Sequence, residues 1–350
     1  MKFDFRSMTK WAVVIIVTLL CIIVLGTCIL IMESGLEYTV NDDGKTCTIT
    51  GIGKYSSEFL HIPDAIGGYE VTAIADYAFK GTDISMVSGG NNITQIGKRA
   101  FQDCENLLDV ILPQNLKTIE EGTFYNCTHL KSIRLPYGII EIGDFAFYSC
   151  HRMTKINMPN ALKTIGELSF GLCVSLENIV IPEGVSEIRQ GAFYYCPLLT
   201  DIHFPASVVS VQGTILPFNN LSTINVDVNN TVLSSVDGNL YAYNNTVLVN
   251  YACAKPDISF EIPESVNKIL TLSLAGCTNL KNISIPKGVT YIGDQIFCNS
   301  PNIEVIYYEG TIEDWRRIDK EDGWKDNTES MFTIICTDGE IAKDGRLTYK

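Results

Sequence analysis

The sequence predicts a solenoid that is dominated by short parallel β-strands and contains about nine coils. The first observation is a pattern that recurs five times between Ile96 and Ser210 with a period of 23 residues. The second is that each of these repeats contains an alternating apolar run ending at a proline, as a short strand does. The third is the composition, 46% hydrophobic and 19% charged residues, which excludes a disordered chain.

Each repeat has two parts. The first is the segment I-G-x-x-A-F-x-x-C, which we expect to form a tight, one-turn-helical stretch with its apolar residues on one side. The second is a strand, as in the run from Leu130 to Pro136, where proline ends the strand because it has no N–H to donate. A repeat cannot bury its apolar side alone, so successive strands should stack into a parallel sheet. The predicted coils open at residues 74, 96, 119, 142, 165, 188, 211, 269 and 292.

Two segments depart from the regular pattern. Residues 35–73 are turn-rich and strand-like, and we interpret them as an N-terminal β cap because the first coil would otherwise expose its core. About thirty residues, 227–256, are inserted into the seventh coil. Two alternating runs on either side of Asn244 and Asn245 predict a β-hairpin within this insert.

An uncharged run of 22 residues, Trp11–Met32, precedes the repeats. It is long enough to span a bilayer as a helix, and the basic residues before it place residues 1–10 in the cytoplasm. The alternative is a cleaved signal peptide. We expect a single-pass membrane protein anchored through residues 11–32 with its C-terminal domain extracellular, or a secreted protein if the segment is cleaved. Both interpretations place the repeats outside the cytoplasm.

The charge balance argues against some partners. Lys and Arg number 26 against 40 acidic residues, which gives a net charge of −14. This charge opposes binding to nucleic-acid phosphates and to anionic lipid surfaces. An acidic surface also keeps an apolar, elongated protein soluble. We therefore predict no nucleic-acid partner.

The repeat unit I-G-x-x-A-F-x-x-C-x-x-L-x-x-I-x-I-P resembles the BspA-like, or Treponema-type, leucine-rich repeat family, over about residues 62–308. The segment Tyr308-Glu309-Gly310-Thr311, with Trp315 and the run Cys336-Thr337-Asp338-Gly339, resembles the closing cap of that family. The resemblance implies an α/β-type leucine-rich repeat solenoid over residues 74–308 and a C-terminal cap over residues 309–350. It also implies cell-surface proteins of bacteria and some protists, several of them adhesins, with no conserved enzyme activity.

Six cysteines occupy the same phase of their coils: Cys104, Cys127, Cys150, Cys173, Cys196 and Cys277. Stacking would place successive ones about 5 Å apart, within the range for a disulfide. Their side chains should point inward in parallel, however, which is poor geometry for a disulfide, and the first five cannot all pair. We therefore expect a buried, reduced structural ladder, although the sequence leaves open which cysteines form disulfides. Neither a C-x-x-C motif nor a histidine at ligand spacing is present, which argues against a metal site.

The sequence contains no recognisable catalytic motif. It lacks G-x-S-x-G, H-E-x-x-H, Walker and dinucleotide-binding patterns, and its four histidines fall at different phases of the repeat. We predict that the protein is not an enzyme and takes no cofactor. The remaining enzymatic alternative is a site formed by the insert and the C-terminal cap, around Tyr241, Trp315, Arg316 and Trp324.

The exposed positions of the stacked strands form two rows. The first contains Asp109, Ser132, Lys155, Asn178, Asp201 and Asn282, and the second contains Ile111, Arg134, Asn157, Val180, His203 and Ser284. These residues vary while their buried neighbours are constant, as in a face that specialises in recognition, although an unconstrained solvent-exposed face would vary too. We predict that this face binds a protein or glycan on another cell or in the matrix, with the flanks and the insert as rival positions. The alternative function is a structural or spacer component of the cell surface. Neither the ligand's identity nor the oligomeric state follows from the sequence.

Overall fold

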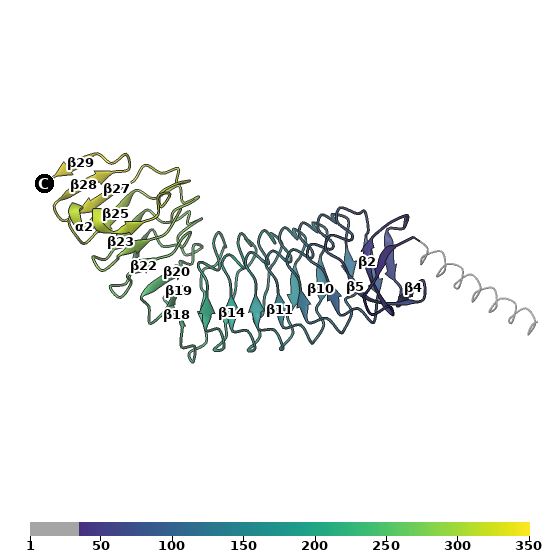
Figure 1. Cartoon of the computed structure of the whole chain (residues 1–350). Coiled ribbons are helices and arrows are strands. Elements are labelled where there is room, and N and C mark those ends of the chain that lie inside the picture. Colours follow the sequence, from purple (N-terminus) through teal and green to yellow (C-terminus); the bar gives the residue numbers. More distant parts are fainter. Residues whose placement is uncertain (1–34) are drawn as a thin grey trace, which may run out of the picture.

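The computed structural model describes residues 35–350, and nearly all of its regular structure is β-strand. The chain forms an elongated solenoid of about eleven turns, with coils of about 23 residues stacked along the rod (Figure 1). The only helix in the described residues is α2 (Ile312–Arg317), near the C-terminus. The predicted solenoid of short parallel strands is confirmed. Its expected α/β character is wrong, because the described coils contain almost no helix: the six residues of α2 lie in the last coil, between β25 and β26.

One strand of each coil contributes to a parallel ladder that we call ladder A. Each short strand ends at the isoleucine or valine that opens the coil, and the register advances by one coil at a time. Ile119 is opposite Ile142, for example, and Ile142 is opposite Ile165. In the first half of the rod the members are β5 (Tyr69–Ile74), β7 (Gln95–Ile96), β9 (Thr118–Ile119), β11 (Glu141–Ile142), β13 (Thr164–Ile165), β14 (Glu187–Ile188) and β16 (Ser210–Val211).

The second strand of each coil contributes to ladder B, which is also parallel. Its residues alternate between exposed and buried, as in Ser132, Ile133 and Arg134, because successive side chains of a strand point to opposite faces. Single bridges extend the ladder where no full strand forms, as between Lys155 and Asn178. The members are β3 (Phe59–Ile62), β6 (Met86–Gly89), β8 (Asp109–Val110), β10 (Ser132–Arg134), β12 (Lys155–Asn157), β15 (His203–Phe204) and β17 (Asn225–Val226).

The segments predicted to be one-turn helices are instead pairs of turns. Backbone N–H groups of one coil donate to carbonyls of the next, from Phe124 to Ala146 and from Phe147 to Ser169, both at 2.8 Å. The backbone is left-handed at the third and seventh residues after the coil opening, as at Phe145 (φ 57°) and Ser149 (φ 60°). A right-handed helix cannot contain these residues. Each left-handed residue costs about 1–2 kcal/mol, and the hydrogen bonds between coils offset that cost.

A continuous stack of aromatic rings fills the inside of the regular coils. Neighbouring ring centroids are 5.2 to 5.6 Å apart, with interplanar angles of 6° to 16°. The six rings, all fully buried, belong to Phe79, Phe101, Phe124, Phe147, Phe170 and Phe193. The constant period of the sequence brings the same side chain to the same place in every coil, so that the sequence period is also the packing period.

The regular stack ends at β16 and β17, where an antiparallel meander begins. The meander consists of β18 (Leu233–Val236), β19 (Asn239–Ala242) and β20 (Val247–Asn250). β20 also pairs in parallel with the next coil, so it belongs both to the predicted insert and to ladder A. The buried residues form two hydrophobic clusters that meet here, one spanning Leu36 to Ala252 and the other Tyr241 to Ile341. The rod bends at this junction (Figure 1).

The second stack repeats the two ladders and ends in a cap. Ladder A continues from β20 through β22 (Lys268–Ile269), β24 (Tyr291–Ile292) and β26 (Asp319–Lys320). Ladder B consists of β21 (Ser259–Glu261), β23 (Asn282–Ile285), β25 (Val305–Tyr308) and β27 (Thr333–Cys336). The antiparallel strands β28 (Gly339–Ala342) and β29 (Leu347–Tyr349) follow β27 and close the sheet. α2 begins at a capping box formed by Thr311 and Asp314.

The N-terminal segment adds a further position to ladder A. β1 (Glu37–Val40) pairs antiparallel with β2 (Thr46–Gly51), and β4 (Ala65–Ile66) pairs antiparallel with β5. β2 is parallel to β5, with Ile49 opposite Ile74, and thus stands where a preceding coil would. β2, β20 and β26 extend ladder A beyond the nine predicted coil openings, and the solenoid has about eleven turns. Their segments lack the full set of Phe, Cys and Pro by which the repeat is counted.

Within residues 35–350, no helix is long and apolar enough to cross a membrane. The predicted cytoplasmic residues 1–10 and the predicted anchor, residues 11–32, lie outside the described part of the chain.

Candidate functional site

The exposed side of ladder B in the regular stack carries most of the residues predicted to bind a ligand. The parallel register sets Ser132 beside Lys155, and Arg134 beside Asn157. We call this surface the ladder B face. It brings together ten of the predicted residues, all exposed: Asp109, Ile111, Ser132, Arg134, Lys155, Asn157, Asn178, Val180, Asp201 and His203.

The centre of the ladder B face is a shallow hollow of about 460 Å³. It is lined by Ser132, Ile133 and Arg134 of β10 and by Lys155, Ile156 and Asn157 of β12. Its polar side chains are a hydroxyl, a guanidinium, an ammonium and an amide. Within residues 35–350, neither cation forms an ion pair with a carboxylate. Both cations therefore remain available to an anionic group of a ligand.

Two exposed apolar side chains flank this hollow. Ile111 is 60% exposed and Val180 is 78% exposed, and both are in the same row as Arg134. Asp109 and Asp201, in the neighbouring row, carry the opposite charge at the two ends of the group. The face thus offers hydrogen-bond donors and two cations between two apolar contacts.

Asn282 and Ser284 do not belong to this surface. Both are on β23, in the second stack, and both are only partly exposed. Ladder B is interrupted between β17 and β21, where the meander intervenes. The prediction of one continuous row is therefore wrong at these two positions.

The ladder B face also extends toward the N-terminus beyond the predicted residues. Phe59 of β3 is opposite Met86 of β6, and both side chains are exposed. His61 and Ser88 form the adjacent pair, with Nδ1 and Oγ 3.4 Å apart. The available signal was the alternation from Phe59 to Ile62. It was missed because no Phe-x-x-Cys segment precedes β3, although Pro63 follows the strand as in the regular repeats.

Five of the six predicted ladder cysteines are fully buried free thiols: Cys104, Cys127, Cys150, Cys173 and Cys196. Each Sγ lies 3.0 to 3.3 Å from the carbonyl oxygen of a phenylalanine in the preceding coil. Burial raises the pKa of the Cys104 thiol to about 11 and that of Cys196 to about 12. It raises the pKa of the three thiols between them well above the usual value. The thiols are therefore protonated at neutral pH and donate to the main chain, which makes them unreactive.

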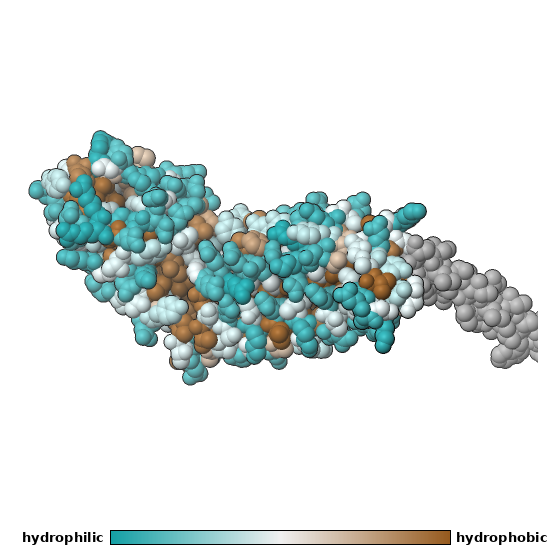
Figure 2. Space-filling model, in the orientation of Figure 1, coloured by the Kyte–Doolittle hydropathy of each residue, from teal (hydrophilic) through white to brown (hydrophobic). Residues whose placement is uncertain are grey.

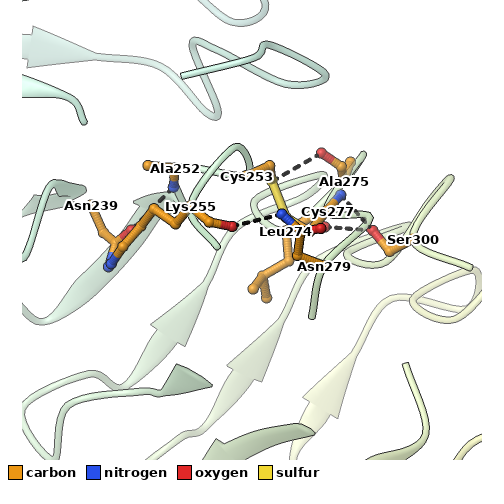
Figure 3. Close-up of a disulfide and its surroundings, with 9 residues drawn as sticks. All are labelled: Asn239, Ala252, Cys253, Lys255, Leu274, Ala275, Cys277, Asn279 and Ser300. Carbon is orange, nitrogen blue, oxygen red and sulfur yellow. Dashed lines mark hydrogen bonds between the residues drawn. A yellow bond between two sulfur atoms is a disulfide. The ribbon is translucent and has the colours of Figure 1, made fainter. Parts of the chain in front are cut away.

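Cys277 departs from the predicted reduced ladder, because it forms a disulfide with Cys253 (Figure 3). The two Cα atoms are 4.5 Å apart, and the pair joins the end of the meander to the next coil. The meander stands in place of the usual Phe-x-x-Cys segment in the coil before Cys277. Cys253, at the end of the meander, lies beside Cys277 instead. The Cys277 backbone N–H donates to Ser300 Oγ at 3.0 Å, and this hydroxyl donates to the Leu274 carbonyl at 2.8 Å.

The structure does not assemble the enzymatic site that was the alternative. Trp315, Arg316 and Trp324 line one hollow in the C-terminal cap, and the rings of Trp315 and Trp324 are 5.7 Å apart. Tyr241 is buried in β19 and is not among the residues that line this hollow. Within residues 35–350, no group of three or more His, Cys, Asp or Glu side chains could hold a metal ion.

Comparison with known families gives an extended match. The model described as "BspA type Leucine rich repeat region" matches in six copies, over residues 50–170, 118–248 and 246–317. These matches include both ladders of the regular stack, the meander and most of the second stack. No curated protein sequence matches the chain.

Several solved structures have the same fold. A leucine rich cell surface protein from Faecalibacterium prausnitzii A2-165 has a TM-score of 0.67 and 22% identity, covering 83% of this chain and 97% of its own. The pneumococcal vaccine antigen PcpA has a TM-score of 0.57 and 22% identity, covering 78% of this chain and 68% of its own. A leucine-rich repeat protein from Bacteroides ovatus ATCC 8483 has a TM-score of 0.51 and 20% identity, covering 87% and 76%. At these identities the likeness shows the fold alone.

Proposed function

Because the chain belongs to the BspA-type leucine-rich repeat family, we propose that it is a cell-surface protein that binds a protein or glycan through the ladder B face. The proposal assigns it no catalytic step. The description of the Faecalibacterium protein as a cell surface protein supports the location. So does the apolar run 11–32, which has the length and flanking charges of a membrane anchor.

The observation that carries this proposal is the hollow at the centre of the ladder B face. Arg134 and Lys155 are exposed there and pair with no carboxylate of residues 35–350, in a chain whose net charge is −14. An acidic group of a ligand would pair with both cations, while Ile111 and Val180 would contact apolar parts of the same ligand on either side. We therefore expect the ligand to carry carboxylate or sulfate groups, and its binding to weaken as salt concentration rises.

The test is binding of the full chain, held in detergent, to immobilised matrix proteins and to a glycan array. The test variant changes Arg134, Lys155, Asn157 and His203 together to alanine. A matched control variant changes four residues of ladder A or the residues beside it to alanine: Lys117, Glu141, Lys163 and Ser186. We expect saturable binding that is at least tenfold weaker in the ladder B variant and unchanged in the ladder A variant.

Other outcomes would contradict the proposal. Equal binding by both variants would move the site away from the ladder B face, to the meander or the caps. Loss in the ladder A variant alone would assign recognition to the other ladder. If the full chain bound no ligand in either assay, a structural or spacer role at the cell surface would replace the binding function.

A further inference from the structure

A second hollow, of about 270 Å³, lies in the C-terminal cap. Residues of α2, β26, β27 and the β28–β29 hairpin surround it, and its apolar walls are formed mainly by Trp315, Trp324, Phe332, Ile341 and Leu347. Figure 2 shows an apolar area among hydrophilic side chains over this part of the cap. The hollow is separate from the ladder B face and shares no residue with the hollow at the centre of that face.

The polar side chains that line the cap hollow are all hydrogen-bond donors. Four are cationic, Arg316, Lys320, Lys325 and Lys343, and the two indole rings add N–H groups. The lining contains no Asp, Glu, Asn, Gln, Ser, Thr or His side chain. A cavity that offers donors and positive charge without a side-chain acceptor is complementary to an anion.

Main-chain carbonyls hold the three ammonium groups in place. Lys320 Nζ donates to the carbonyls of Trp315 at 2.6 Å and Ile318 at 2.7 Å. Lys343 Nζ donates to the carbonyls of Thr328 and Ser330, and Lys325 Nζ donates to the Lys343 carbonyl. An ammonium has three N–H bonds, so each of these lysines retains at least one. Within residues 35–350 none of the three forms an ion pair with a carboxylate.

A cap must cover the end of the hydrophobic core, and this role explains only part of the arrangement of cations around the hollow. Lysine stems do cover aromatic rings here: Lys320 Nζ is 5.2 Å from the Trp315 ring centroid, and Lys343 Nζ is 5.7 Å from that of Phe332. That role needs the stems, but it needs neither four charges nor an open hollow. A hollow of about 350 Å³ near the N-terminal end of the rod has the opposite lining, with Glu58 and Asp83 and no cation. The end of a solenoid therefore does not gather cations by itself.

We propose that the cap hollow binds a carboxylate-bearing sugar ring, such as a single uronic acid residue of a glycan. The carboxylate would accept the free N–H bonds of Lys320 and Lys343, whose ammonium groups the main chain already holds. The C–H faces of the ring would contact Trp324, Phe332 and Leu347. Hollows for drug-sized ligands begin at about 300 Å³, so this volume suits one ring. A simple inorganic anion would leave the apolar walls unused, and a neutral sugar would leave the charges unpaired.

Intrinsic fluorescence provides a direct test, because two of the three tryptophans, Trp315 and Trp324, line this hollow. The full chain with Trp11→Phe, in detergent, would be titrated with glucuronate. We expect a saturable fluorescence change that weakens with added salt. Lys320→Met and Lys343→Met keep the apolar stem and remove the charge, and each should weaken binding about tenfold. Lys281→Met is the matched control, since Lys281 pairs with Glu304 at the surface and does not line the hollow.

Two further titrations, with glucose and with glutamate, decide between classes of ligand. Equal affinity for glucose would overturn the proposal by showing that charge plays no part. Affinity for glutamate equal to that for glucuronate would overturn the assignment to a sugar in favour of an acidic side chain. No saturable change with any of these probes would overturn the site itself. The ladder B variant described above should respond like the unmodified chain, so the result is independent of the function proposed for that face.

Discussion

The two stacks solve the same packing problem with different side chains. Eight residues after the coil opening, the regular stack carries cysteines whose thiols donate to a carbonyl of the preceding coil. Where the regular stack ends and in the second stack, this position holds Asn219, Ser300 and Thr328. Their side chains donate to the carbonyls of Phe193, Leu274 and Phe297 at 3.0, 2.8 and 3.2 Å. Cys277 has the same position in its coil but is in the disulfide and cannot donate. In the other coils compared, the position holds a small buried donor, and sulfur is one of several ways to supply it.

The two stacks also differ in how their aromatic rings pack. The phenylalanines of the regular stack are nearly parallel, as between Phe124 and Phe147 at 10°. In the second stack the Phe297 ring meets the Trp324 ring edge to face, at 68°. The two hydrophobic clusters meet at the meander, whose buried residues are divided between them, and the disulfide belongs to the second cluster. Because each coil contacts mainly its neighbours, this division of the core should let the two stacks unfold separately.

The largest expected effect comes from Phe147→Ala. Phe147 is fully buried between Phe124 and Phe170, and the coil spacing prevents these rings from closing the cavity. We expect the free energy of unfolding of the regular stack to fall by about 3–5 kcal/mol. Urea unfolding followed by far-ultraviolet circular dichroism would measure it in a Trp11→Phe background, while tryptophan fluorescence would report on the second stack alone.

Phe297→Ala is the matched control for this experiment. Phe297 contacts Trp324 and Phe332, so its loss should move the fluorescence transition and leave the first stack unchanged. If Phe147→Ala moved both transitions equally, the rod would unfold as one unit and the separation into two stacks would be wrong. If it moved neither, the ring stack would not be part of the core.

The disulfide should affect the stability of the second stack only. Cys253 and Cys277 are 24 residues apart, and the chain-entropy model gives about 3 kcal/mol for closing a loop of that length. Changing both to serine should therefore lower the urea midpoint of the fluorescence transition without changing the first stack. A reducing agent should have the same effect on the unmodified chain and none on the double variant. A shift of the regular stack upon reduction would show that its ladder thiols are not free.

The regular part of the fold could be predicted because every coil needs the same ring and the same strand at the same place. The turns could not, since Phe145, Leu168 and Tyr195 have left-handed backbones and their residue types do not favour that conformation. β20 was missed as a coil because Cys253 stands five residues after Leu248, where the repeat has phenylalanine. The disulfide was missed because Cys253 does not fall at the phase of the other ladder cysteines.

Sequence-based prediction of the two candidate binding surfaces has the same limit. Alternation along each strand was enough to predict the exposed side chains of the ladder B face, including Arg134 and Lys155. It could not predict the hollow between them, which depends on how neighbouring coils pack. The cap hollow was even harder to predict from the sequence. Lys320 stands at a coil-opening position that usually holds isoleucine or valine, and Lys343 follows no repeat phase. Only the folded cap brings both to Trp315 and Phe332.

The smallest effect tests whether the ladder position requires a donor or sulfur. Cys150→Ser and Cys150→Ala both remove the bulk of the sulfur, but only serine can still donate to the Phe124 carbonyl, which the thiol reaches at 3.3 Å. The Phe124 carbonyl keeps the Cys127 backbone N–H as a donor at 3.2 Å, so the alanine variant loses one hydrogen bond and leaves no carbonyl unpaired. It should be less stable than the serine variant by about 0.5–1.5 kcal/mol. Circular dichroism in urea would measure the difference, and Ser300→Ala against Ser300→Cys would repeat it in the second stack. Equal stability of Cys150→Ser and Cys150→Ala would mean that sulfur packing sets this position, and the serine of the second stack would then need another explanation.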